Sequence, residues 1–459
     1  MDPARAYATL TFLRGALVAL AVALLAGLLA GLYYIPAVGL AFLHWGIDFA
    51  VLRPVHTTFA AAWIFLGGLA VVHRYLEEHA PPPSRAERWR LRLQVSLWAL
   101  AGLGVLTTLI AGITSGREYV GFHPALSLPI IIGWILFGWN FYRATWKGFW
   151  SRPVYVTMWG VGILFFAYTF IEQHAWLIPE IFQSPVVDLR LQWKATGTLV
   201  GSFNLFVYGS LIYVGEKLSG DERYAQSKLA YGLFAVGLLN SFTNFAHHTY
   251  HIPQSELVKW ISFVVSMAEI LIVARVLWDL VSLVSQRAAQ SFNSARYFLV
   301  LAKWWTLAMV FSSVLIAVPP LNALIHGTHV VTAHAMGAEI GIDTMVLFAG
   351  VSWLLMGIYA RQGRDSAVLH SGRLRLAARG FNISTVLLVI WLNVSGTVVG
   401  YTRYLDLAPP DWLARSNGLV FGGVGMAVAL FLALLLGIWL RCLFVTPSVL
   451  ADSNSGDTS

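Results

Sequence analysis

The chain contains 459 residues, of which 58% are hydrophobic and only 11% are charged. Soluble domains carry about 25% charged residues, so this composition excludes an ordinary soluble globular protein. The single cysteine, Cys442, excludes a disulfide framework, a cysteine-ligated iron–sulfur cluster and a covalent c-type haem. The net charge of +8 comes from basic residues scattered over short loops. We interpret this excess as a membrane-topology signal and expect no nucleic-acid partner.

Apolar segments long enough to cross a bilayer follow one another along the whole chain. They fall approximately at 10–35, 51–73, 94–115, 125–146, 153–177, 195–215, 229–248, 257–285, 298–318, 326–358, 378–400 and 418–440. The sequence therefore predicts an all-α polytopic membrane protein with about twelve transmembrane helices in contact with lipid. The first apolar run lacks a clear cleavage site, so no signal peptide is expected. We expect residues 1–445 to form one transmembrane domain and the polar residues 446–459 to form a disordered tail.

The loops alternate in charge, which predicts an orientation. One set of loops carries most of the basic residues: Arg74, Arg85, Arg88, Arg90, Arg92, Arg143, Lys147, Arg152, Lys217, Arg223, Lys228, Arg287, Arg296, Lys303, Arg361, Arg364, Arg373, Arg375 and Arg379. By the positive-inside rule, this set and both termini are expected in the cytoplasm. The regular alternation also favours an even number of spans.

Thirteen histidines in so apolar a chain need an explanation, because ionisable groups inside a bilayer are costly and usually functional. Several are interpreted as loop residues at span ends: His73, His79, His123 and His370. The histidines of interest are His56, His247, His248, His251, His326, His329 and His334.

Topology places four of these histidines at one depth. His56 opens the second span, His247 and His248 close the seventh, and His334 lies about two turns into the tenth. All four are therefore expected in the outer part of the membrane, where clustered imidazoles suggest bound metal or haem. The alternative for His56 alone is a hydrogen-bonded or interfacial histidine without a ligand.

The tenth span also contains Met336, two positions after His334. Two positions correspond to about 200° around a helix, so the two side chains project to opposite sides. Such a helix can serve two haems, one on each face. The alternative is that Met336 is an ordinary packing residue.

Five motifs together resemble subunit I of the haem-copper oxidase superfamily, on its nitric oxide reductase and cbb-type side. They are RPVHTT at 53–58, GREYVG at 116–121, HHTYHIPQ at 247–254, SMAE at 266–269 and HGTHVVTAHAM at 326–336. The resemblance spans most of the chain and implies the bundle of that superfamily. It also implies a multi-pass protein of a bacterial or archaeal plasma membrane.

The resemblance implies roles for the histidines. His56 matches an axial ligand of a low-spin haem, and His334 matches the proximal ligand of a high-spin haem, both expected to be b-type. His247 and His248 match ligands of a non-haem metal, iron in the reductases and copper in the oxidases.

The resemblance also implies roles for two carboxylates. Glu118 is similar to a carboxylate that binds calcium near the haem propionates of nitric oxide reductases. Glu269 is similar to a reductase glutamate near the active site that is associated with proton delivery. The alternative for Glu269 is a structural glutamate hydrogen-bonded between helices.

The chain departs from the family at two positions. The third metal-ligating histidine of the family would fall on the sixth span, where this chain has Ala195, Thr196 and Gly197. Either a neighbouring oxygen or nitrogen group completes the metal site, or the metal binds weakly or not at all. Met336 stands where the family has the second axial histidine, which predicts a His56–Met336 haem. The alternatives are a five-coordinate haem or the loss of this haem.

The substrate is predicted from a missing tyrosine. Oxygen-reducing members carry a tyrosine linked to a metal-ligating histidine, and the matching position here is Ser241. This favours an atypical nitric oxide reductase, which converts two NO to N2O and water. The alternatives are a terminal oxidase with altered ligands, or a non-catalytic haem protein or transporter on the same fold. The resemblance implies a partner subunit of cytochrome c or cupredoxin type as electron donor, with quinol as the alternative.

Overall fold

The computed structural model describes residues 3–287 and 293–444, and all regular secondary structure in these ranges is helical. The predicted all-α class is therefore confirmed. The predicted disordered tail, 446–459, lies outside the described residues.

Twelve helical segments within the described ranges are long and apolar enough to cross a membrane. They are Pro3–Leu32, Phe49–His79, Arg85–Ile110, Pro124–Thr145, Val154–Leu177, Pro185–Ser219, Lys228–His248, Glu256–Gln286, Ser294–Ala317, His329–Arg361, Gly372–Tyr404 and Asp411–Leu443. Each of them coincides with one of the predicted apolar segments, so the count of twelve is confirmed and the chain is a multi-pass membrane protein.

The helices have the following bounds. The long ones are α1 (Pro3–Leu32), α3 (Phe49–His79), α4 (Arg85–Ile110), α5 (Ser127–Thr145), α6 (Val154–Glu172), α8 (Pro185–Ser219), α9 (Lys228–Thr243), α10 (Glu256–Arg287), α11 (Ser294–Ala317), α14 (Met345–Arg361), α15 (Gly372–Tyr404) and α17 (Gly425–Phe444). The short ones are α2 (Pro36–His44), α7 (Pro179–Phe182), α12 (Pro319–Ile325), α13 (His329–Met336) and α16 (Asp411–Leu419).

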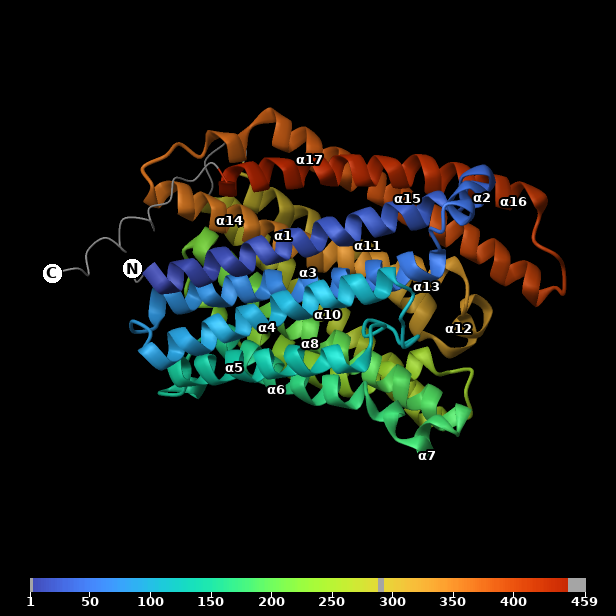
Figure 1. Ribbon diagram of the computed structural model, residues 1–459, viewed down its shortest axis with the longest axis horizontal. Helices are drawn as coiled ribbons and strands as arrows, with labels where there is room; N and C mark the ends of the chain where they lie inside the picture. The colour runs from blue at the N-terminus through green and yellow to red at the C-terminus, as the bar shows by residue number, and fades with distance from the viewer. Residues whose placement is uncertain (1–2, 288–292, 445–459) are drawn as a thin grey trace.

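The long helices run side by side along the long axis of the molecule (Figure 1). Helix α1 begins at the end of the bundle where the N label lies, and α2, α7, α12 and α16 lie at the opposite end. We call these the α1-start end and the α2 end. Because the number of spans is even, α17 finishes at the α1-start end.

Polar side chains fix where several helices begin. The side chains of Asp48, Ser84, Ser227, Asn293 and Ser371 precede α3, α4, α9, α11 and α15, and each accepts a hydrogen bond from a backbone N–H in the first turn. These bonds satisfy amide groups that have no partner within the helix. Several helices begin before the predicted apolar segments, because their first turns are polar.

The interior of the bundle is built around α3, α6, α8 and the tenth span. In the most apolar stretch of α8, 89% of the residues are buried, compared with 17% in α10. The outer helices expose large apolar side chains such as Leu100, Leu257 and Phe311, as lipid-facing surfaces do. The inner helices are therefore the ones that can hold a site shielded from lipid and water.

The tenth span is not a uniform α-helix. It consists of α13, the π-helical segment η6 (Gly337–Thr344) and α14. Gly337 and Gly341 of η6 pack so closely against Met309 and Trp305 of α11 that a Cβ atom at either glycine would collide with them. π-Helical turns are rare and frequently occur at functional sites.

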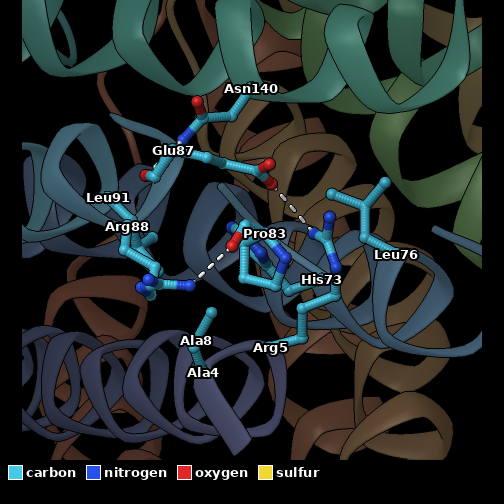
Figure 2. Close-up of a pocket in the computed structure, with 10 residues that line it drawn as sticks. All are labelled: Ala4, Arg5, Ala8, His73, Leu76, Pro83, Glu87, Arg88, Leu91 and Asn140. Atoms are coloured by element: carbon cyan, nitrogen blue, oxygen red, sulfur yellow. Dashed lines mark hydrogen bonds and ion pairs between the residues drawn. The ribbon is translucent and has the colours of Figure 1, made fainter. Parts of the chain in front are cut away.

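The α1-start end is closed by ion pairs and contains a small cavity. Arg5 of α1 lies 3.0 Å from Glu87 of α4 and donates to the carbonyl of Pro81. The cavity beside them measures about 20 Å³, which is room for a single water molecule (Figure 2).

His73 lines this cavity and stacks on Phe12 with ring centroids 4.5 Å apart. The interpretation of His73 as a loop residue was therefore wrong, because α3 continues to His79 and carries His73 inside the bundle.

Candidate functional site

His56 lies in the second turn of α3 and is held by α1. Its Nδ1 donates to the backbone carbonyl of Ala23 at 2.8 Å. A Cβ atom at Gly27 would lie 2.6 Å from that nitrogen, so only glycine allows the ring to sit there. A carbonyl oxygen can only accept, so the neutral ring keeps its lone pair on Nε2. Histidines that bind metals show this arrangement, with the far nitrogen fixed by a backbone carbonyl. The local geometry of His56 thus fits an axial haem ligand.

His247 and His248 end the seventh span in a short 3₁₀-helix, η5 (Asn244–His248). Their ring centroids lie 4.3 Å apart. The ring of His248 stacks on Trp193 of α8, with centroids 5.3 Å apart and planes within 2°. Nδ1 of His247 is buried and has no hydrogen-bond partner among the described residues. A buried imidazole nitrogen without a partner is costly, and a bound metal ion would satisfy it.

His334 lies on α13, within electrostatic range of both His247 and His248. Its Nδ1 is 3.4 Å from Oγ of Ser312 on α11, which leaves Nε2 for a ligand. The structure therefore brings together three of the four histidines that topology placed at one depth. They lie toward the α2 end, where α12 and α13 are seen in Figure 1.

The start of the tenth span differs from its predicted place. Gly327 has φ +70, and Thr328 caps α13 by accepting from the backbone N–H of Val330. The span therefore begins at His329 rather than at residue 326, and His334 lies about one and a half turns into it. Met336 is the last residue of α13 and is half-buried against the core. It is two helical positions from His334, as predicted, and its bond to a haem stays a prediction.

The sixth span lacks the third histidine of the family, and a polar side chain from the end of the seventh span packs against this part of it. Gly197 on α8 lies so close to η5 that a Cβ atom there would be 2.9 Å from Oδ1 of Asn244. Nδ2 of Asn244 donates to the carbonyl of Gly197 at 3.5 Å, whereas Oδ1 is buried and has no partner in the described part of the chain. Side chains three residues apart eclipse each other in a 3₁₀-helix, so Asn244 and His247 share one face of η5. An amide oxygen is therefore carried on the same face of η5 as His247.

No group of three or more His, Cys, Asp or Glu side chains in residues 3–287 and 293–444 is arranged to hold a metal ion. The candidate site instead consists of two histidines and the amide oxygen of Asn244. The donor set nevertheless fits a metal such as iron or copper, since imidazole suits both and the amide supplies a third ligand.

Glu269 is buried on α10 and hydrogen-bonded by three residues. Nδ2 of Asn240 and Nδ2 of Asn204 donate to its carboxylate, and the hydroxyl of Tyr208 also hydrogen-bonds to it. Oγ of Ser266 donates to Oδ1 of Asn240 at 2.9 Å and thereby orients that amide. The predicted interhelical hydrogen bonding is present, and it holds the carboxyl group between α8, α9 and α10. The role of Glu269 in proton delivery stays a prediction.

Glu118 lies in the connection between α4 and η1 (Pro124–Leu126). Its Oε2 is 2.6 Å from the guanidinium of Arg53, at the start of α3. This arginine supplies the positive charge that the resemblance assigns to calcium, so these residues do not fit a calcium ion. The next residue, Tyr119, has a left-handed φ of 59 and donates its hydroxyl to Glu339 on η6 at 2.7 Å.

Two further histidines that the sequence singled out form a pair near the α2 end. The rings of His251 and His326 have centroids 4.1 Å apart. Arg403 of α15 donates to the backbone carbonyl of His326 at 2.8 Å. Burial, together with nearby His251 and Arg403, lowers the pKa of His326, which is therefore neutral at pH 7. His329 is a structural residue, since its Nδ1 is 2.8 Å from Oγ of Ser395.

Three further polar residues, Asn244, Glu339 and Asp343, were not predicted from the sequence. Glu339 and Asp343 are the only acidic residues in the tenth span as the structure bounds it, and their charge inside an apolar segment was a readable signal. Asn244 carried no such signal, because its unpartnered oxygen depends on the 3₁₀ geometry and on the approach of Gly197.

Comparison with known proteins decides the family. The model of the family described as cytochrome c and quinol oxidase polypeptide I matches residues 7–417. This chain belongs to the haem-copper oxidase subunit I family. It is 24% identical to a subunit of nitric oxide reductase from Stutzerimonas stutzeri over 423 residues, which cover 85% of this chain and 83% of that protein.

The fold agrees with this assignment. A cryo-EM structure of a heme-copper terminal oxidase dimer aligns with a TM-score of 0.69 and 15% identity, covering 98% of this chain and 85% of that one. The family resemblance predicted from five motifs is therefore confirmed. The chain is a membrane oxidoreductase of a family whose members bind haems and a copper or iron centre.

Proposed function

We propose that this protein reduces nitric oxide, converting 2 NO, two electrons and two protons to N2O and water. The observation that carries the proposal is the packing of Ser241. Its side chain is buried, Oγ donates to the carbonyl of Gly237 at 2.8 Å, and a Cβ atom at the facing Gly201 would collide with it. There is no room for a tyrosine at this position, and the resemblance assigns the oxidases a tyrosine there for cleaving dioxygen.

Similarity to a nitric oxide reductase subunit over 85% of the chain supports the same reaction. The reaction needs a site for two small gas molecules and a pair of redox centres. His334 would hold a haem, and His247 and His248 a non-haem metal ion; together these groups would supply the redox chemistry that the reaction needs. The chain itself contributes the placement of these three imidazoles within electrostatic range of one another.

We propose that Oδ1 of Asn244 is the third protein ligand of the non-haem metal. It is buried with no hydrogen-bond partner among the described residues, it shares a face of η5 with His247, and its amide is anchored through Nδ2 to Gly197. The close approach of Gly197 leaves no space for a histidine on α8 at this point. A neutral oxygen ligand completes the site without adding a buried charge.

Glu269 is proposed to supply protons to the reaction. Asn204, Tyr208 and Asn240 hold its carboxyl group in place. The same three groups can hydrogen-bond either the protonated or the ionised carboxyl, because amides and hydroxyls remain hydrogen-bonding partners in both states. Such a carboxyl group can lose and regain a proton without moving a helix.

A second haem, on His56 and Met336, is proposed as the entry point for electrons. The fixed tautomer of His56 supports its share of this site, and the helical spacing of Met336 from His334 supports two haems on two faces of the tenth span. A partner subunit of cytochrome c or cupredoxin type is proposed as donor, with quinol as the alternative. The similar protein of Stutzerimonas stutzeri is itself described as one subunit of its enzyme.

The test compares two gases in one preparation. The purified haem-loaded protein is supplied with a defined chemical reductant and a mediator, then with NO or with O2. N2O formation at one molecule per two NO consumed, without comparable O2 uptake, is the expected result. Sustained four-electron O2 uptake without N2O formation would instead show a terminal oxidase, and turnover of neither gas would show a haem protein without this chemistry.

A further inference from the structure

Two carboxylates inside the tenth span are not explained by the metal or haem sites. Glu339 and Asp343 both lie on the π-helical segment η6. Residues four apart in a helix lie on the same face, about one turn from each other. The two carboxyl groups therefore share one face of η6, within electrostatic range of each other.

The two carboxyl groups have different partners. Oε1 of Glu339 accepts a hydrogen bond of 2.7 Å from the hydroxyl of Tyr119. Asp343 is 6% exposed, and the described part of the chain provides its side chain with no hydrogen bond or ion pair. An unpartnered carboxyl group that is more than nine-tenths buried is costly if it is ionised.

Nearby elements do not supply a compensating positive charge. The groups within electrostatic range of the pair are Tyr119 and Glu118 from the loop after α4, Tyr208 from α8 and Glu269 from α10. Helix α11 presents uncharged Trp305 and Met309 to η6. Arg53 of α3, which influences Tyr119 electrostatically, is paired with Glu118. Among the described residues, no ion pair includes Glu339 or Asp343.

Two adjacent carboxylates without a cation cannot both remain ionised in such a place. Ionising the buried Asp343 beside the partly buried Glu339 is unfavourable, because the charge is desolvated and the like charges repel. A proton on either carboxyl group removes one of the two charges. The Tyr119 hydroxyl donates to Oε1 of Glu339, and that oxygen can accept this hydrogen bond whether the carboxyl group is ionised or protonated at its other oxygen.

We propose that Glu339 and Asp343 form a proton-holding pair that retains at least one proton at neutral pH. The Tyr119 hydroxyl donates to Glu339, and the Tyr208 hydroxyl, which hydrogen-bonds to Glu269, lies within electrostatic range of Asp343. When Glu269 gives up a proton to the reaction, Asp343 replaces it through the Tyr208 hydroxyl, and the pair regains one by way of Tyr119. Each cycle moves one proton in and one out, so the charge of the pair is restored. This delivery role rests on the proposed nitric oxide reduction, whereas the holding of a proton does not.

Infrared spectroscopy of the haem-loaded protein in lipid nanodiscs tests the holding of the proton without turnover. The variants are E339Q, D343N and the double variant, with E256Q as control, since Glu256 is exposed and paired with Lys259. The wild-type minus double-variant spectrum at pH 7 is expected to show the carbonyl band of a protonated carboxylic acid, shifted in D2O. In D343N, the pH at which this band disappears is expected to fall, because a negative neighbour has been removed. E256Q is expected to leave the band unchanged.

Absence of a carboxylic acid band from that difference spectrum at pH 7, with an unchanged haem absorption spectrum, would overturn the proposal. Such a result would mean that both groups are ionised and that a cation neutralises them. The delivery role is tested separately: E339Q is expected to slow N2O formation at least tenfold. An unchanged rate would refute delivery alone. Failure of the wild type to form N2O, with the band present, would refute the proposed function but leave the proton-holding pair intact.

Discussion

At the scale of single residues, the site depends on side-chain atoms that lack a partner within the described part of the protein. Nδ1 of His247 and Oδ1 of Asn244 are both buried without hydrogen bonds there, and the two residues lie on one face of η5. His56 shows the complementary feature, because one ring nitrogen is fixed by Ala23 and the other is left available. Unsatisfied buried polar atoms are rare in folded proteins, so their clustering here indicates that ligands complete them.

The proposed amide ligand gives the first residue-scale prediction. Replacing Asn244 by Ala removes the oxygen and is expected to lower the occupancy of the non-haem metal at least tenfold, with both haems retained. N244D restores an oxygen donor and is expected to recover the metal. The measurement is metal content per haem by mass spectrometry after dialysis. Asn393 on α15, whose Nδ2 donates to the carbonyl of Val389 on its own helix, supplies the control N393A. Full metal occupancy in N244A would contradict the assignment.

The axial methionine gives the second prediction. A thioether ligand raises the potential of a haem, so M336H is expected to lower the midpoint potential of the low-spin haem and to change its optical and magnetic spectra. Met426 on α17 is half exposed, and M426H serves as the matched control with no expected change. If M336H left the low-spin spectrum unaltered, Met336 would not be a ligand.

Ser312 gives a third prediction, about the positioning of His334. Its hydroxyl is the group that contacts Nδ1 of that histidine. Loss of such supporting contacts typically costs about 10–100-fold in affinity or activity. We expect S312A to release the high-spin haem about tenfold more readily, measured by haem transfer to apomyoglobin. S313A, one residue along α11, is the control, and equal haem release from both variants would argue against a positioning role.

At the scale of elements, the tenth span carries most of the residues to which we assign a role. Within 16 residues, from His329 to Thr344, it passes from α13 to η6 and carries His334, Met336 and the carboxyl pair. Close packing of its glycines against α11 accompanies the π-helical turn. Glu339 and Asp343 are four residues apart, so they share one face of this span.

The fourth prediction tests this packing. A methyl group at Gly341 would collide with the ring of Trp305, and overpacking of this kind costs about 1–3 kcal/mol. We expect G341A to lower the thermal unfolding midpoint of the purified protein, followed by haem absorbance. Gly357 on α14 has open space around it, so G357A is the control and is expected to be neutral or stabilising because alanine favours helix. Equal midpoints for both variants would show that η6 tolerates the added methyl group.

At the scale of the whole molecule, the fold could be predicted well from the sequence and the site only partly. Long apolar segments and motif order were sufficient for the twelve helices and the family, because span length and ligand spacing are local properties. The positions of His247, His248 and His334 followed from topology. The part played by Asn244 did not, because it arises from a 3₁₀ turn and a close approach by Gly197 on another helix. His73 was misplaced for a similar reason, since α3 extends beyond its apolar stretch.

The proposed function depends above all on a haem that faces a second metal ion within one chain. The most direct test is the metal content of the purified full-length protein, expressed with haem and with iron and copper supplied. Two haems and one non-haem iron or copper per chain are expected, the latter lost from H247A and H248A while both haems remain. Two haems without a stoichiometric non-haem metal in the wild-type protein would contradict the proposed site.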